Sequence, residues 1–356
     1  GPGYLDTLAV LGFPADPGLY PIVDVTDDGF DNGSASAPAH TDLYQLGSLT
    51  NPSRVVYAVD RTADGNPHNV GGHGTINAAI VVGYNNDLGF PFEDGGGFQL
   101  GLGLVPFGRI GSSKIFRDSG PFGLIGSFAD LVSGSYGLGA RISTNSWGAD
   151  TFGDYGAMDQ EYDALVRDAQ PLVAGNQQMT MLFAAGNAGP GAGSAGSPGN
   201  AKNVITVGAA ENVRLDGTDG CGISNAGADN AQDIISFSSR GPTDDGRIKP
   251  DVVAPGTHIQ GAASQDPLFN GTSVCGGLGS PYVPLGQTLY TWSSGTSHST
   301  PAVAGAAALL FQRFTSEVGV APSPAMLKAM LVNAARYLSG AGAGGSLPTK
   351  DQGWGE

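Results

Sequence analysis

Basic side chains are scarce in this chain of 356 residues. It carries 16 Lys and Arg against 32 Asp and Glu, which gives a net charge of −16 with neutral histidines. Binding to nucleic acid or to an anionic membrane surface favours the opposite balance, so neither is expected as a partner. The chain has no apolar run of the roughly 18 residues that a membrane span needs, and its first residues, Gly1-Pro2-Gly3-Tyr4, show no signal-peptide pattern.

Cysteine is nearly absent, since the chain has only Cys221 and Cys275. We favour one disulfide in an exported protein, although two unpaired thiols fit the same spacing. Glycine is abundant, with 59 residues, and its lack of a three-residue period excludes collagen and indicates many tight turns. A hydrophobic content of 40% and a charged content of 13% are typical of a folded protein with a large core.

Apolar, β-branched runs alternate with segments of helical pattern along the whole chain. This alternation predicts a parallel sheet that is covered by helices on both faces. With no linker evident, residues 1–356 are expected to form one domain. The predicted strands are 19–26, 53–59, 111–116, 140–148, 179–184 and 204–209, and the predicted helices begin at 73, 122, 159, 297 and 324.

Four polar residues lie at the ends of these predicted elements. Asp27 follows the first strand, Asn187 follows the strand 179–184, and His73 opens a glycine-lined helix. Ser297 ends a loop of small residues and begins an alanine-rich helix, whose N-terminus favours negative charge. Because the carboxyl ends of parallel strands meet at one edge of a sheet, we expect these residues to lie together.

These four residue types suit nucleophilic catalysis. A serine hydroxyl becomes a nucleophile when an imidazole takes its proton, and a carboxylate orients that imidazole. A side-chain amide then donates a hydrogen bond to the oxyanion. The order Asp27, His73, Ser297 along the chain is the order found in subtilisin.

The sequence resembles the subtilisin-type serine proteases (subtilases) over nearly its whole length. The resemblance lies in Asp27-Asp28-Gly29-Phe30, His73-Gly74-Thr75, Ala184-Ala185-Gly186-Asn187 and Gly295-Thr296-Ser297 with Pro301. Further segments are similar to the alkaline, oxidation-resistant subtilisins, among them 144–148, 237–243, 245–251 and 352–355. The resemblance implies a three-layer αβα fold with a mainly parallel central sheet of about seven strands.

The resemblance also implies a role for each matching residue. Asp27 would orient His73, the general base and then acid, and Ser297 would be the nucleophile, with Asn187 and the Ser297 backbone N–H forming the oxyanion hole. The segment Ser146-Trp147-Gly148 would pair with the substrate backbone. The walls of an S1 pocket for a large apolar P1 side chain would be Gly148, Ala184, Ala185, Gly186 and Gly196.

The family further implies a secreted endopeptidase that acts on proteins or peptides without a catalytic cofactor and is made with an N-terminal propeptide. The 32 acidic side chains are compatible with structural calcium. Its ligands are unknown, because the segment 85–108 does not resemble the family's calcium loop. The chain ends at Trp354-Gly355-Glu356, where its close relatives continue into a β-rich C-terminal domain, so we expect that this domain is either absent or removed.

Two features next to the candidate triad depart from the family pattern. His298 replaces the usual methionine after Ser297, and we expect its side chain to point away from the triad. The second departure is that the family's next histidine is missing after His73-Gly74-Thr75, which is followed here by Ile76-Asn77.

Three other functions are compatible with parts of this pattern. A sedolisin-type peptidase is disfavoured by His73 and Asn187, because that family uses Glu as the base and Asp in the oxyanion site. A peptide ligase or macrocyclase on the same scaffold, and an inactive peptide-binding module, remain open.

Overall fold

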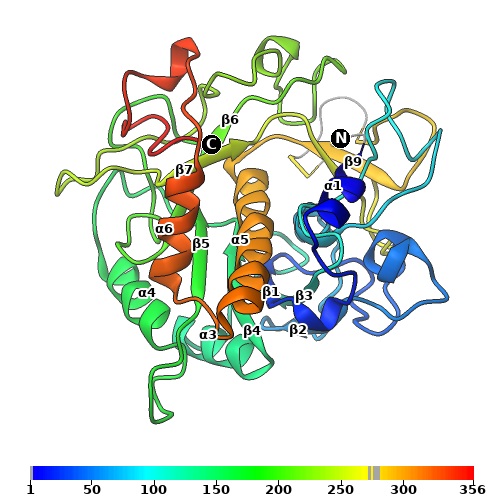
Figure 1. Cartoon of the computed structure of the whole chain (residues 1–356), viewed down its shortest axis with the longest axis horizontal. Helices are drawn as coiled ribbons and strands as arrows, with labels where there is room; N and C mark the ends of the chain where they lie inside the picture. Colours follow the sequence, from blue (N-terminus) through cyan, green and yellow to red (C-terminus); the bar gives the residue numbers. More distant parts are fainter. Residues whose placement is uncertain (1–2, 272–273, 276–280) are drawn as a thin grey trace.

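A seven-stranded parallel sheet runs through the middle of the protein (Figure 1). The structure is a computed structural model that describes residues 3–271, 274–275 and 281–356. The strand order is β2-β3-β1-β4-β5-β6-β7, and β8 and β9 form a separate antiparallel pair. The strands are β1 Ile22–Asp27, β2 Val55–Asp60, β3 Arg109–Lys114, β4 Ala140–Asn145, β5 Thr180–Ala184, β6 Ile205–Ala210, β7 Val252–Pro255, β8 Ile259–Ala262 and β9 Tyr290–Ser293.

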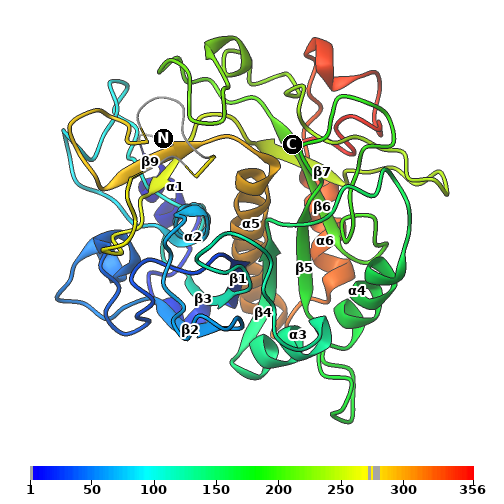
Figure 2. The ribbon, with the colours of Figure 1, turned by 180° about the vertical axis from the view of Figure 1, so that it is seen from behind.

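Helices cover both faces of the sheet, as the sequence predicted. Helix α5 lies beside α6 on one face, where it also packs on α2, and the reverse view shows α3 and α4 (Figures 1 and 2). The helices are α1 Tyr4–Val10, α2 His73–Val82, α3 Phe128–Gly137, α4 Ala157–Arg167, α5 Thr296–Val318 and α6 Pro324–Ala334, with short 3₁₀ turns at Pro17–Leu19, Thr41–Leu43, Gln45–Gly47, Asn225–Gly227 and Ala341–Ala343.

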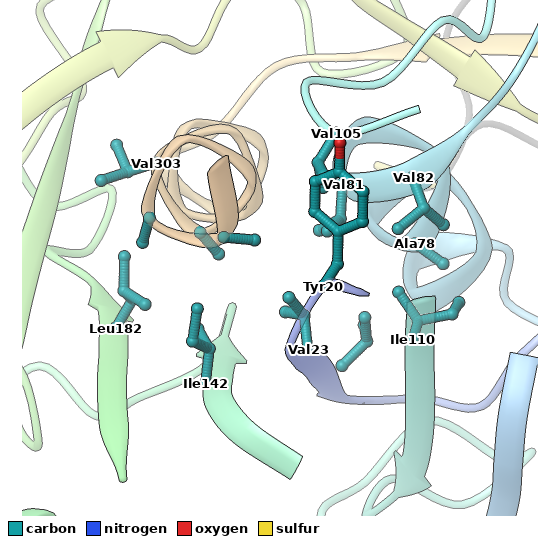
Figure 3. Close-up of a cluster of buried hydrophobic side chains, with 14 of the residues drawn as sticks. Tyr20, Val23, Ala78, Val81, Val82, Val105, Ile110, Ile142, Leu182 and Val303 are labelled. Carbon is teal, nitrogen blue, oxygen red and sulfur yellow. The ribbon is translucent and has the colours of Figure 1, made fainter. Parts of the chain in front are cut away.

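Each central strand sends alternate side chains to the two helical layers. In β5, Leu182 belongs to a buried cluster on the side of α5, whereas Met181 and Phe183 belong to a second cluster with residues of α3 and α4. Figure 3 shows Leu182, Ile142, Val23 and other strand residues directed toward α5 and α2, which lie on the same face of the sheet. The sheet is therefore buried on both faces, and its chemistry is confined to its edges and strand ends.

The predicted strands are confirmed with small shifts, but two features differ from the prediction. Helix α3 begins six residues later than predicted, at Phe128, because Ser127 caps it. The Ser127 hydroxyl accepts from the Asp130 N–H, and the Asp130 carboxylate accepts from the Ser127 N–H. The pair β8 and β9 was missed, because its strands have four residues each and lie 27 residues apart in a polar loop region.

Among the described helices, none is both long enough and apolar enough to cross a membrane.

We predict that Leu182→Ala lowers the free energy of unfolding by about 2–5 kcal/mol, because it leaves a cavity between β5 and α5. Leu172→Ala is the control, since Leu172 is fully exposed, and its effect is expected within about 0.5 kcal/mol. Urea denaturation measures both. Equal losses in the two variants would contradict the placement of Leu182 in the core.

Candidate active site

The candidate residues gather at the carboxyl edge of the sheet. Asp27 is the last residue of β1, and β4, the neighbouring strand, ends at Asn145 just before Ser146. Strand β5 ends at Ala184, three residues before Asn187. The strand 140–148 predicted from the sequence thus stops at Asn145, and Ser146-Trp147-Gly148 continue beyond it at this edge, with Ser146 and Trp147 half-buried and Gly148 exposed.

His73 and Asp27 form a short hydrogen bond. His73 is the first residue of α2, and its Nδ1 lies 2.7 Å from Asp27 Oδ1. Asp27 is only 3% exposed. Helix α2 approaches β1 closely, since a Cβ on Gly74 would lie 2.1 Å from the Gly29 carbonyl oxygen. Glycine after His73 is therefore a steric requirement of this hydrogen bond.

The pair has shifted protonation equilibria. Burial raises the pKa of Asp27, but the charge and hydrogen bond of His73 and the hydrogen bonds from Asn77 and the Asp28 N–H together outweigh it, so the pKa is lowered overall. Burial lowers the pKa of His73, whereas the charge and hydrogen bond of Asp27 and the charge of Asp28 raise it, to about 9 overall. His73 is therefore mostly a cation at neutral pH and becomes a free base in alkaline solution.

Ser297 is the second residue of α5, at the helix N-terminus predicted for it. Its hydroxyl donates to the Ser146 carbonyl oxygen at 3.4 Å, and the Ser146 hydroxyl donates to the Ser297 carbonyl at 2.6 Å. Among the hydrogen bonds of the described residues, none joins Ser297 to His73. Such bonds are often formed only when substrate is bound.

Asn187 presents its amide N–H groups to the cleft. Its Oδ1 accepts from the Thr296 backbone N–H at 3.0 Å and from the Thr296 hydroxyl at 2.9 Å. With the oxygen occupied, Nδ2 is turned toward Gly295 and Ser297, and an added Cβ on Gly295 would lie 3.5 Å from it. Thr296 therefore fixes the orientation that an oxyanion donor requires.

A cavity of about 290 Å³ lies beside Ser297. The cavity is lined by the segment Ser146-Trp147-Gly148 and by all the predicted pocket residues. These pocket residues are Gly148, Ala184, Ala185, Gly186 and Gly196. Sequence reasoning missed Asp150, the one ionisable side chain among the lining residues. Within the described part of the chain, the Asp150 carboxylate forms no hydrogen bond or ion pair.

A second cavity, of about 220 Å³, lies on the other side of Ser146 and contains His73 and the acidic residues Asp28 and Asp118. Burial, followed by the charge of Asp27, raises the pKa of Asp28 to about 7. The Asp28 carboxylate accepts from the Gly74 N–H at 2.6 Å, so it borders the triad directly. The doublet Asp27-Asp28 was the only sequence signal for it.

Cys221 and Cys275 form a disulfide, which confirms the favoured interpretation of the two cysteines. Cys221 Sγ accepts from the Ser294 N–H at 3.2 Å, and the Ser294 hydroxyl donates to Asp219 at 2.5 Å. These contacts fasten the turn that leads into α5, three residues before Ser297.

Asp27, Asp28 and His73 offer three ligand atoms within 4.8 Å of one another, the one such grouping among the described residues. The His73 Nδ1 and Asp27 Oδ1 atoms are already joined by their hydrogen bond. Calcium takes six to eight oxygen ligands and no imidazole nitrogen, so this grouping does not fit calcium.

His298 does not point away from the triad, so that expectation is wrong. Its ring centroid lies 5.4 Å from that of His73, and its Nδ1 lies 2.9 Å from Asn77 Oδ1. No hydrogen bond among the described residues joins it to the Ser297 side chain.

Comparisons with known proteins show the family of this chain. The model of the subtilase family (Peptidase S8) matches residues 19–355. Serine protease AprX of Bacillus subtilis (strain 168) is 30% identical over 255 residues, which are 69% of this chain and 50% of AprX. Pyrolysin of Pyrococcus furiosus is 34% identical over 250 residues, which are 67% of this chain and 16% of pyrolysin.

The chain thus spans half or less of the length of these curated relatives. Among solved structures, sphericase has a TM-score of 0.59 at 21% identity and covers 94% of this chain and 90% of its own. A mutant of the protease domain of PatA has a TM-score of 0.56 at 21% identity, over 97% of this chain and 93% of its own. Both support the fold.

We predict that Asp28→Asn lowers the pKa of His73 below about 9, because one of the two negative charges that raise it is removed. The pKa is read from an NMR titration of the imidazole C–H resonances. The control is Asp150→Asn, which removes an exposed carboxylate from another wall of the cleft. This variant is expected to leave the pKa of His73 unchanged. A His73 midpoint that does not respond to Asp28→Asn would contradict this electrostatic account.

Proposed function

The chain belongs to the subtilase family, and we propose that it is a serine endopeptidase in which Ser297, His73 and Asp27 form the catalytic triad. The observation that carries the proposal is the 2.7 Å hydrogen bond from His73 Nδ1 to the buried Asp27. It commits one ring nitrogen to the carboxylate and leaves Nε2 as the proton acceptor for Ser297.

The reaction follows from this arrangement. Ser297 Oγ attacks the scissile carbonyl carbon while His73 Nε2 takes the hydroxyl proton. The C–N bond then breaks and the same proton passes to the leaving amine, which gives an acyl-enzyme. Water then attacks the ester carbonyl carbon while His73 takes its proton, the bond from that carbon to Ser297 Oγ breaks, and the proton passes from His73 to Ser297 Oγ. Asn187 Nδ2 and the Ser297 backbone N–H are the proposed donors to the oxyanion in both steps.

The substrate is proposed to bind as an extended strand along Ser146-Trp147-Gly148. Two features of the structure support this mode of binding. Trp147 stacks on Phe128 at 5.6 Å and meets Phe183 edge-on at 5.4 Å, so the segment is held rigidly. Directly after it, Ala149 and Ser197 pair through both backbone hydrogen bonds, which fixes the far wall of the cleft.

We propose the cavity beside Ser297 as the S1 pocket. Its volume of about 290 Å³ and its glycine and alanine walls favour a large P1 side chain with an apolar body. Asp150 adds a carboxylate, so a lysine or arginine could lay its methylene stem along the walls and place its charge near Asp150.

Several finer points are also proposals. Secretion is supported by the disulfide, which forms in oxidising compartments. A likeness to alkaline, oxidation-resistant subtilisins is supported by the segments 144–148, 237–243, 245–251 and 352–355 and by His298, which has no oxidisable thioether. One domain over residues 1–356 is proposed because no linker is evident in the sequence, and structural calcium because the chain has 32 acidic side chains. An N-terminal propeptide rests on the family resemblance alone.

Hydrolysis of a chromogenic peptide library tests the proposed function. Ser297→Ala is expected to reduce turnover to background, and Asn187→Ala to lower kcat roughly 100- to 1,000-fold, the loss known from subtilisin itself. Ser143→Ala, a serine buried within β4, is the control and is expected to stay active. Peptide that binds without any turnover points to the binding module, and joined rather than hydrolysed peptides point to a ligase. Either result contradicts the proposal.

The role of Asp150 is tested by comparing P1 lysine with P1 phenylalanine. We predict that Asp150→Asn lowers kcat/KM for P1 lysine by roughly three- to tenfold, because a partly solvated charge pair is lost. The value for P1 phenylalanine is expected to stay unchanged. Equal changes for both substrates would show that Asp150 does not discriminate between P1 side chains.

A further inference from the structure

Asn77 and His298, which lie next to the triad, contact each other. Asn77 lies one turn after His73 on α2, and His298 follows Ser297 on α5. Their side chains are buried, at 0% and 1% exposure, and His298 Nδ1 lies 2.9 Å from Asn77 Oδ1. Neither residue has a role in the chemistry proposed above.

Asn77 also contacts the catalytic carboxylate. Its Nδ2 donates to Asp27 Oδ2 at 2.9 Å, whereas Asp27 Oδ1 accepts from His73 at 2.7 Å and from the Asp28 N–H at 2.8 Å. Among the described residues, Asn77 is the one hydrogen-bond donor to Oδ2. The plane of the carboxylate is therefore fixed on one side by His73 and on the other by Asn77.

The Asp27 carboxylate sets the orientation of the Asn77 amide, and His298 Nδ1 contacts the amide oxygen on the other side. An amide turned the other way would place its oxygen against the Asp27 carboxylate, which is repulsive, and its N–H₂ against His298. Asn77 Oδ1 must therefore accept, and His298 must carry its proton on Nδ1. Burial, together with the charge of His73, lowers the pKa of His298 to about 3, so this imidazole is neutral and holds one proton. The ionisable groups around Asp27 are His73 and His298 from the two helices and Asp28 from its own turn.

We propose that Asn77 and His298 are positioning residues that hold Asp27 in line with His73, with His298 acting through Asn77. The proposal rests on the proposed function for its kinetic consequences. Four side chains from β1, α2 and α5 then form one path of hydrogen bonds, from His298 through Asn77 and Asp27 to His73. This path connects α5, which carries Ser297, to α2, which carries His73.

Kinetics of three variants test this path. Asn77→Leu removes the donor at nearly constant volume and is expected to lower kcat roughly 10- to 100-fold with little change in KM, because a hydrogen bond to a buried charge is lost. His298→Met removes the donor to Asn77 and is expected to lower kcat roughly tenfold. His298→Gln, of similar size, keeps an N–H donor and is expected to retain most of the wild-type kcat.

The double variant Asn77→Leu/His298→Met distinguishes a path from two separate effects. If His298 acts through Asn77, the double variant has the kcat of Asn77→Leu alone. Losses that multiply, or equal kcat values for His298→Met and His298→Gln, would overturn the proposal. Thermal melting confirms that each variant is folded.

A second readout needs no turnover, so it decides the proposal even if the proposed function fails. NMR follows the exchange with water of the His73 Nδ1 proton, which the bond to Asp27 protects. Asn77→Leu and His298→Met are expected to accelerate this exchange about tenfold, and His298→Gln is not. Unchanged exchange in Asn77→Leu would overturn the positioning role, whereas absent hydrolysis with accelerated exchange would overturn only the proposed function.

Discussion

The hydrogen bond between Asp27 and His73 is the constraint on which the rest of the site depends. It joins a buried carboxylate at the end of β1 to the first residue of α2 over 2.7 Å. An isolated charge at this depth would be costly, so the carboxylate needs every donor around it. His73, Asn77 and the Asp28 N–H supply those donors. The same bond fixes which nitrogen of His73 can accept a proton.

The remaining elements bring the nucleophile to this pair. Helix α5 packs across both β4 and α2, so its N-terminus reaches the same edge of the sheet. The turn before it is fastened through Ser294 to Cys221 and Asp219. Thr296 orients Asn187 in turn. Asn187 and the turn before Ser297 are thus held by neighbours that take no part in the chemistry, which is how a site achieves fixed geometry without strain.

The sheet, most of its strands and the four main site residues could be predicted from the sequence, because buried parallel strands and polar strand ends have clear patterns. Asp28, Asp150 and the orientation of His298 could not. Their importance depends on contacts between β1, α2 and α5, which are distant in sequence, and Asp150 carries no motif. The start of α3 was misplaced for a local reason, since the cap formed by Ser127 and Asp130 outweighs the apolar residues before it.

Covalent labelling with a phosphofluoridate tests the central claim most directly. The account predicts one phosphoryl group per chain, located by mass spectrometry on Ser297, with labelling abolished in His73→Ala and slowed in Asp27→Asn. The label reports on the nucleophile without requiring the right peptide substrate. Labelling of another residue, or labelling of Ser297 that proceeds equally well without His73, would contradict the triad proposed here.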